Sequence, residues 1–394
     1  MSFDINKIPH INEIANNGSF NGARSKNTET FQQRCSDCNK IVPSLEEAIK
    51  KSGLRDGMTI SFHHHFRNGD HIINNVLDKL AEMGFKNLTL AASSLSAVHA
   101  PLIEHIRSGL ITHIETSGLR GELAEQISRG LMDFPVVFRS HGGRASAIRS
   151  GELHIDVAFL GAPSCDPYGN ANGYSRDDDD GISCGSLGYA RTDVEFADKV
   201  IIITNNIVSY PNAPWAIPEH DVDYVVRVDD IGDPKGIMSG ATRYTKDPKE
   251  LLIAKTAANV VEAAGYLYDG FSMQMGSGGA SLATARFIRQ KMLDKGIRCR
   301  FALGGITGQI TAMHEEGLID RILDVQSFDL DAAKSLKNNH FHHQISATYY
   351  ASHLVATAAE QLDFVILSAL EIDTDFNVNV LTGSDGVIRG AIGG

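Results

Sequence analysis

The amino-acid sequence predicts an α/β fold made of two duplicated, open domains, each with a mostly parallel sheet. Three observations predict it. Short β-branched runs alternate with amphipathic helical segments, their order occurs twice, and 394 residues exceed the length of one ordinary domain. The expected division is a polar lead-in over 1–45, a first domain over 46–248 and a second domain over 249–394.

The first half of the chain alternates between strand-like and helix-like segments. Residues 58–64 (MTISFHH) predict a strand, and 70–84 have apolar residues at helical spacing that end at Gly84. The remaining segments of this half are expected, in chain order, as a strand at 87–93, a helix at 98–109, and strands at 136–140, 155–161, 199–204 and 223–228. This alternation is typical of a parallel sheet because parallel strands need helical crossovers.

The second half repeats the segments of the first half in the same order. Residues 56–60 match 269–273, and 155–172 match 362–379, while the offset falls slowly from 213 to 207 residues. In the second match six of 18 positions are identical: Asp156/Asp363, Leu160/Leu367, Ala162/Ala369, Asp166/Asp373, Asn170/Asn377 and Asn172/Asn379. Since copy two is shorter, we expect its sheet to lack strands at the C-terminal end.

Composition excludes several classes of protein. The net charge of −12 and the absence of a basic stripe argue against nucleic-acid binding. No run of 18 apolar residues and no N-terminal apolar segment is present, so we expect a cytoplasmic protein without a membrane span. The five cysteines form no disulfide framework, and Cys35 and Cys38 make a single CxxC without a partner pair, so no metal site is predicted.

A glycine-rich turn, Gly276, Ser277, Gly278 and Gly279, lies between a predicted strand and a predicted helix. Without Cβ atoms, such a turn lets backbone N–H groups and a helix N-terminus approach an anion or an oxyanion. The alternative is a tight strand-to-helix turn without a ligand. The spacing matches neither a dinucleotide-binding fingerprint nor a P-loop.

The equivalent turn of copy one contains three consecutive histidines. On a strand, neighbours point to opposite faces, so His63 and His65 are expected to converge while His64 points away. No acidic or cysteine ligand lies at a recognisable spacing. We therefore favour a polar, substrate-binding wall formed with Arg67 over a metal site.

Four polar residues follow the apolar strand expected at 364–370. They are Glu371, Asp373, Asn377 and Asn379. Ligands gather at the carboxyl ends of strands in open α/β sheets, so these residues are candidates for catalysis. A turn held by Asp and Asn side chains is the alternative.

Several motifs taken together resemble the α subunits of bacterial citrate lyase, in the CoA-transferase-like superfamily. They include "GMTISFHHHFRNGD", "TSGLRGELAEQISRGLM", "SHGGRASAI", "GAPSCDPYGNANG", "CGSLGYARTD", "GSGGASLA" and "EIDTDFNVNVLTGSDGVIRGAIGG". The resemblance runs from about Leu54 to Gly394 and departs from the family pattern in the stretch "YYASHLVATAAE". It implies two related α/β domains of the CoA-transferase type with the active site between them.

The resemblance also implies an activity. An acetyl thioester on an acyl carrier (γ) subunit would exchange with citrate, giving citryl thioester and acetate, and a β subunit would cleave the product to oxaloacetate. The chain would act as a citrate CoA-transferase component of citrate lyase, in a homo-oligomeric complex with the β and γ subunits. No covalently bound cofactor is implied, and acyl-CoA or the phosphoribosyl-dephospho-CoA arm of the carrier would be a substrate.

Site residues follow from the same resemblance. The turn Gly276–Gly279 would lie near the acyl thioester, and arginines would bind citrate, with Arg67, Arg120, Arg144 and Arg389 as candidates. The glycines expected to approach the CoA-type arm further along the chain are Gly304, Gly305, Gly390, Gly393 and Gly394.

The mechanism expected from this comparison has no covalent enzyme intermediate. The position of the superfamily's nucleophilic glutamate falls near Gly304, so transfer would proceed through a ternary complex without a glutamyl thioester. Two alternatives stay open: a transferase or hydrolase acting on free CoA thioesters, and a ligand-binding regulatory module of the same fold.

Overall fold

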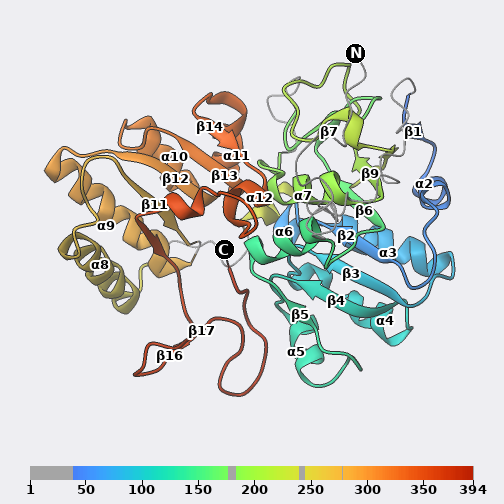
Figure 1. The fold of residues 1–394 in the computed structure, drawn as a ribbon, viewed down its shortest axis with the longest axis horizontal. Helices are drawn as coiled ribbons and strands as arrows, with labels where there is room; N and C mark the ends of the chain where they lie inside the picture. Colours follow the sequence, from blue (N-terminus) through green and yellow to red (C-terminus); the bar gives the residue numbers. More distant parts are fainter. Residues whose placement is uncertain (1–38, 176–182, 239–244, 277, 394) are drawn as a thin grey trace, which may run out of the picture.

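The computed structural model describes residues 39–175, 183–238, 245–276 and 278–393. They form two lobes that lie side by side (Figure 1). Cys35, Cys38, Ser277, Gly394 and most of the lead-in lie outside the described residues. No helix of the described part is long and apolar enough to cross a membrane.

The first lobe is built on an eight-stranded sheet in the order β1-β10-β9-β6-β2-β3-β4-β5, with every neighbouring pair parallel. Its strands are β1 (Ile41–Val42), β2 (Thr59–Phe62), β3 (Leu88–Ala92), β4 (Ile111–Thr116), β5 (Val137–Phe138), β6 (Val157–Gly161), β9 (Lys199–Thr204) and β10 (Tyr224–Arg227). Its helices are α2 (Leu45–Ser52), α3 (Ile72–Glu82), α4 (Leu102–Arg107), α5 (Glu122–Ser128), α6 (His141–Ser150) and α7 (Gly188–Phe196). A two-stranded hairpin, β7 (Ser164–Cys165) and β8 (Ala171–Asn172), follows β6.

The second lobe is built on a five-stranded parallel sheet in the order β14-β13-β12-β11-β15. Its strands are β11 (Phe271–Met275), β12 (Cys299–Ile306), β13 (Ile322–Ser327), β14 (His342–Gln344) and β15 (Phe364–Ile366). Its helices are α8 (Pro248–Ala263), α9 (Gly279–Lys295), α10 (Gly308–Glu315), α11 (Leu330–Asn338) and α12 (Ala347–Ala351). A hairpin, β16 (Glu371–Ile372) and β17 (Val378–Asn379), follows β15 and extends away from this lobe (Figure 1).

The two sheets share one strand order. The strand order β6-β2-β3-β4-β5 in the sheet of the first lobe corresponds to β15-β11-β12-β13-β14 in the second. In each lobe an antiparallel hairpin follows the first strand of this series, β6 or β15. Both hairpins use the same turn, because Asp166 and Asp373 accept hydrogen bonds from the backbone and side chain of the asparagine four residues later. This order agrees with the α/β repeat seen in the sequence; superposition of the two domains and their boundaries stay predictions.

Three features differ from the sequence-based expectation. Strand β4 was not expected as a separate element. Ile41 and Val42 were assigned to the lead-in but form strand β1, which pairs with β10. A strand of two residues is too short to show the alternation of apolar and polar side chains by which strands are recognised. The apolar run that includes Phe364 is only partly buried, because β15 is the edge strand of its sheet.

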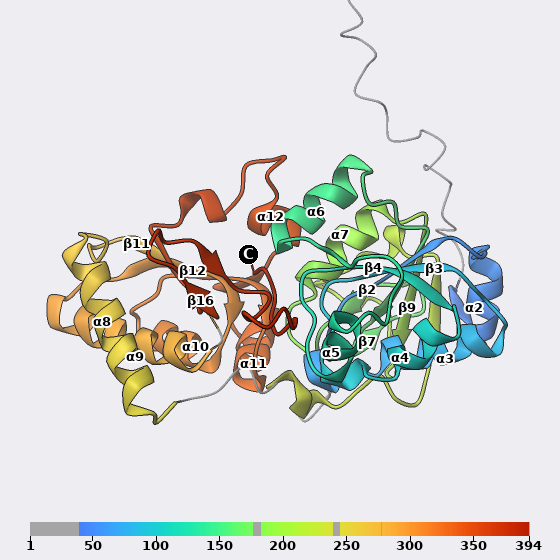
Figure 2. The same ribbon diagram turned by 90° about the horizontal axis from the view of Figure 1, so that it is seen from below.

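The lobes pack closely where glycines allow backbone contact. A Cβ atom on Gly142 of α6 would lie 1.8 Å from the carbonyl oxygen of Ala351 in α12. A Cβ atom on Gly188 at the start of α7 would lie 2.2 Å from the carbonyl oxygen of Ile345. Figure 2 shows α12 beside α6 and α7 at this junction. Only glycine can hold the lobes this close together.

Candidate active site between the lobes

The candidate site lies where the segments after β2, β4 and β5 of the first lobe meet the ends of β12 and β13 of the second. His64 joins them, since its Nε2 donates to Gln326 Oε1 at 2.9 Å and the Gln326 amide donates back to the His64 carbonyl. Its Nδ1 lies 2.6 Å from the Ser93 hydroxyl. Burial first, and then the positive charge of Arg67, lower the pKa of His64 well below its usual value, so the ring is neutral.

The three side chains point as expected from strand alternation, because the rings of His63 and His65 lie 5.5 Å apart and His64 faces the second lobe. His63 contacts the Gly161 carbonyl at 3.0 Å, and His65 contacts Asp70 at 2.6 Å, both inside the first lobe. The side chains of His65 and Asp70 are fully buried. Burial opposes ionisation of Asp70, but the charge and hydrogen bond of His65 outweigh it and lower the Asp70 pKa to about 2. His63 and His65 thus have partners inside the first lobe, and a substrate-binding role for them stays a prediction.

Two arginines of the first lobe, Arg67 and Arg120, lie within electrostatic range of one another, and Arg67 also acts on His64. Arg67 is 8% exposed, donates to the Ile237 carbonyl and stacks 4.3 Å from the ring centroid of Phe328 in the second lobe. Burial, together with the charge of Arg120, lowers the Arg67 pKa to about 10. Arg120 is partly buried and its pKa is lowered by burial; its backbone N–H donates to the Leu95 carbonyl, but its guanidinium forms no hydrogen bond or ion pair with a described residue.

Further polar atoms at this junction have no partner among the described residues. They are Ser117 Oγ after β4, His141 Nδ1 at the start of α6 and Thr307 Oγ1 after β12. Burial, then the charges of Arg120 and Arg144, lower the pKa of His141 to about 4. Unpaired buried donors beside two guanidinium groups are typical of a site whose anionic ligand completes the hydrogen bonding.

Residues 388–393 return from the second lobe and form a strap along the first, so that the end of the chain lies between the lobes in both views (Figures 1 and 2). Leu119 N–H donates to the Gly390 carbonyl, and His141 N–H donates to the Gly393 carbonyl. A Cβ atom on Gly390 would lie 2.1 Å from the Val380 carbonyl oxygen. The structure therefore brings Gly390 and Gly393 next to the segments that contain Arg120 and His141.

The glycine turn lies at the carboxyl ends of β11 and β15. Gly276 N–H donates to the Ile366 carbonyl at 2.7 Å, and Gly278 is the N-cap of α9, with no side-chain cap. A Cβ atom on Gly278 would lie 2.9 Å from Ser368 Oγ. Among the described residues, no side chain caps the first N–H groups of α9, which fits the approach of a carbonyl or phosphate oxygen.

Gly304 and Gly305 lie at the end of β12, and both exclude a side chain. Gly304 has φ = +98°, and a Cβ atom there would lie 2.8 Å from the Gln274 amide carbon. A Cβ atom on Gly305 would lie 2.0 Å from the ring of Phe328, the residue on which Arg67 stacks. Gly305 therefore permits the stacking that positions Arg67.

The structure does not bring the predicted catalytic hairpin to this cluster. Glu371, Asp373, Asn377 and Phe376 are exposed, and Asp373 accepts only from its own turn. Asn379 donates to Thr382 and Glu371, and Glu371 bonds Ser384. These bonds favour the alternative of an Asp/Asn turn.

Two of the arginine candidates are also engaged elsewhere. Arg389 is exposed and forms a local ion pair with Asp385. Arg144 is buried and binds Asp193 at 2.8 Å, and it also donates to the Ala91 carbonyl. Arg144 thus ties α6 and α7 to β3. Both Arg144 and Arg389 have a carboxylate partner in the protein, whereas the guanidinium of Arg120 has none among the described residues and can bind an anionic ligand.

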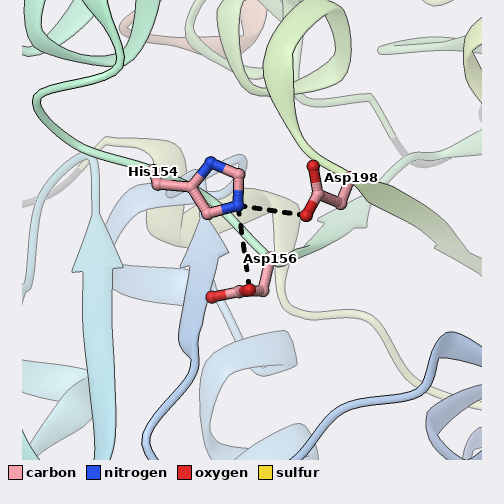
Figure 3. Close-up of side chains that lie close together, drawn as sticks. All are labelled: His154, Asp156 and Asp198. Carbon is pink, nitrogen blue, oxygen red and sulfur yellow. Dashed lines mark hydrogen bonds and ion pairs between the residues drawn. The ribbon is translucent and has the colours of Figure 1, made fainter. Parts of the chain in front are cut away.

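The described residues contain one group with the geometry of a metal site, His154, Asp156 and Asp198 (Figure 3). It lies at the amino ends of β6 and β9, whereas the cluster described above lies at carboxyl ends. His154 Nε2 contacts Asp198 at 3.0 Å and Asp156 at 3.7 Å, and Asp156 also accepts from the Thr59 backbone. Asp363 holds Ser272 in the same way in the second lobe. Asp156 therefore has a structural explanation, and no metal is assigned.

These elements define the class of protein: an open α/β protein in which two parallel-sheet lobes meet at the carboxyl ends of their strands around buried cations and glycine turns. Comparison with known proteins gives the particular family. The family model "Citrate lyase, alpha subunit (CitF)" matches residues 38–394. The chain belongs to the citrate lyase α subunit family.

Individual relatives agree. The chain is 60% identical over 356 residues to the citrate lyase alpha chain of Haemophilus influenzae, covering 90% of this chain and 70% of the relative. It is 57% identical over 367 residues to the Escherichia coli protein, covering 93% and 71%. A crystal structure of the citrate lyase α subunit of Streptococcus mutans in complex with citrate superimposes with a TM-score of 0.87 at 56% identity, covering 91% of this chain and 70% of that one. The chain thus spans about 70% of the length of these relatives.

Reasoning from residue pattern missed His64, Ser117 and His141. Each comes from a segment that carried the family resemblance, which was the one signal available. Without that resemblance their types and spacings form no recognisable motif.

Proposed function

We propose that the chain transfers the acyl-carrier thioester from acetate to citrate, with citrate bound between Arg67 and Arg120. The observation that carries this proposal is the unpartnered, partly buried guanidinium of Arg120 beside the buried Arg67. The proposal is also supported by membership of the citrate lyase α family, in which one relative was crystallised with citrate.

The charge balance of the site suits a tricarboxylate. Two like charges in a partly dry environment repel, and burial removes the water that would solvate them. Arginine forms paired hydrogen bonds with a carboxylate, so bound citrate would satisfy both guanidinium groups at once. His64 and His141, neutral at physiological pH, would add hydrogen bonds without adding charge.

The glycine turn would hold the other substrate. Backbone N–H groups at the start of α9, around Gly278, would face the thioester carbonyl or the phosphoribosyl-dephospho-CoA arm of the acyl carrier. The arm supplies the thioester, and the strap glycines Gly390 and Gly393 would border it. The acyl carrier (γ) and lyase (β) subunits are the partners that this function requires.

The reaction can proceed without a nucleophile from the protein. A citrate carboxylate oxygen attacks the acetyl thioester carbon, the C–S bond breaks, and a thiolate and a mixed anhydride result. The thiolate then attacks the citryl carbonyl carbon of the anhydride, and acetate leaves with the bridging oxygen. Because one thioester replaces another, the overall reaction is close to neutral in free energy. Holding both substrates in place would therefore account for most of the catalysis.

The position expected for a glutamyl nucleophile supports this route. Gly304 has no side chain and its surroundings exclude one. Glu316, nearby in sequence, is bound to Arg289 on the surface. We expect borohydride treatment after incubation with acetyl donor to reduce no glutamyl thioester on this chain, and initial rates to follow sequential kinetics. A borohydride-labelled glutamate, with free thiol released by acetyl donor alone, would contradict this mechanism.

Replacing Arg120 tests the citrate site directly. Arg120→Met keeps the length of the side chain and removes the charge, so citrate affinity should fall about 100-fold, since a hydrogen-bonded charge contributes on the order of 1.5–3 kcal/mol. Calorimetric titration with citrate measures the loss. Without citrate the variant should melt no lower than the parent, because an unpaired cation has been removed.

The matched control is Arg107→Met, which removes an exposed arginine paired with Glu104 on α4. It should leave citrate affinity unchanged. Equal citrate affinity in the parent and Arg120→Met would rule out this location of the site. Rates with acetylated carrier and with acetyl-CoA, measured on the assembled complex, would distinguish the carrier-dependent activity from one on free CoA thioesters.

A further inference from the structure

Tyr189 lies at the centre of the junction without a role in the scheme above. It is the second residue of α7 and is only 6% exposed. Its ring packs with apolar residues of the second lobe, Phe301, Leu303 and Val325, in one cluster. Its ring centroid lies 4.9 Å from that of His141 and 5.7 Å from that of His64.

The hydroxyl group of Tyr189 has no hydrogen-bond partner among the described residues. The hydroxyl oxygen is not among the fully buried polar atoms without a partner, so it keeps contact with solvent although the ring is buried. The hydroxyl of the neighbouring Tyr350 is instead bonded to the Gln274 amide at 2.8 Å. The Tyr189 hydroxyl can therefore bind a ligand that enters the junction, whereas that of Tyr350 is already engaged.

The surroundings determine what kind of ligand it is. Tyr189 lies within electrostatic range of Arg67 and Arg144, and its pKa is raised well above the usual value, first by burial. A protonated phenol can donate its hydrogen to an anionic oxygen that the same cations attract, and its own oxygen can also accept. Arg144 is bound to Asp193, and the anionic ligand proposed above at Arg67 and Arg120 would supply such an oxygen.

We propose that the Tyr189 hydroxyl donates a hydrogen bond to a citrate carboxylate and is a substrate-binding residue of the transferase. This inference rests on the proposed function, because it places Tyr189 in the same site as Arg67 and Arg120. The ring would separate the citrate from the apolar core of the second lobe, and the hydroxyl would orient one carboxylate.

The test uses Tyr189→Phe, which keeps the ring and removes only the hydroxyl. Citrate and tricarballylate, which has the same three carboxylates without the hydroxyl, are titrated into the full chain by calorimetry. Both should bind about 10- to 100-fold more weakly to the variant than to the parent. Without ligand, the variant should melt at the same temperature as the parent or higher, because no protein hydrogen bond has been lost.

Tyr350→Phe is the matched control. It leaves the buried Gln274 amide unpaired, so it should lower the melting temperature and leave citrate affinity unchanged. Unchanged citrate affinity in Tyr189→Phe overturns the inference and leaves the proposed function intact. A loss confined to citrate, or a melting temperature lowered as in Tyr350→Phe, also overturns it. If the parent itself binds no citrate, the proposed function fails, and the inference fails with it.

Discussion

Between pH 6.5 and pH 4 the protein should lose several kcal/mol of its free energy of unfolding, because four histidines are buried in the neutral form. Burial is the first cause in each case: it lowers the pKa of His63 to about 3, those of His99 and His141 to about 4, and that of His64 well below its usual value. An unfolded histidine has a pKa near 6.5.

The direction of the effect follows from proton binding. Below pH 6.5 the unfolded chain binds protons that the folded chain does not, so acid favours unfolding. The full stability is present above about pH 6.5 and is lost as the pH falls towards the folded pKa values. Each histidine contributes at most about 1.4 kcal/mol per pH unit in this window.

Denaturant unfolding at pH 7.5, 6 and 5 measures this dependence. His99→Asn removes one of the buried imidazoles, so it should reduce the change in unfolding free energy with pH. The variant should still fold, since Asn can accept the Ser96 N–H that His99 Nδ1 accepts. His220→Gln, which changes an exposed histidine, should leave the slope as it is. Equal free energies of unfolding at pH 7.5 and pH 5 would show that the four rings are not buried and neutral.

Gly142→Ala should destabilise the protein by about 3 kcal/mol or more, because the new methyl group would lie 1.8 Å from the carbonyl oxygen of Ala351. This obstacle is backbone of the other lobe and cannot rotate away. Relief requires α6 and α12 to separate, which would also widen the junction that holds Arg67 and His64. Both melting temperature and citrate affinity should therefore fall.

The adjacent glycine of the same helix provides the control. In Gly143→Ala the methyl group would meet side-chain atoms alone, Ser140 Oγ at 3.0 Å and Arg139 Cβ at 3.9 Å, and alanine favours a helix over glycine by up to about 1 kcal/mol. Its melting temperature should stay close to that of the parent. If Gly142→Ala and Gly143→Ala have the same melting temperature, the contact between Gly142 and Ala351 does not determine how the lobes pack.

The sequence by itself determined the elements and their repetition. Buried parallel strands need β-branched runs and their helices need apolar residues every three to four positions, and both patterns are local. The turn that ends in Gly278 could be placed between β11 and α9 for the same reason. The repeated Asp-x-x-x-Asn turn was visible in the alignment of the two copies, and both hairpins contain it.

The tertiary structure alone decided which polar residues meet. Strand alternation predicted that His64 points away from His63 and His65, but only the packing of the lobes shows that Gln326 is its partner. Arg144 and Arg120 could not be told apart in sequence, because only packing pairs Arg144 with Asp193. Such contacts join residues far apart along the chain, and no local pattern records them. Packing also determines which groups have no side-chain partner among the described residues, as is the case for the Arg120 guanidinium and the Tyr189 hydroxyl.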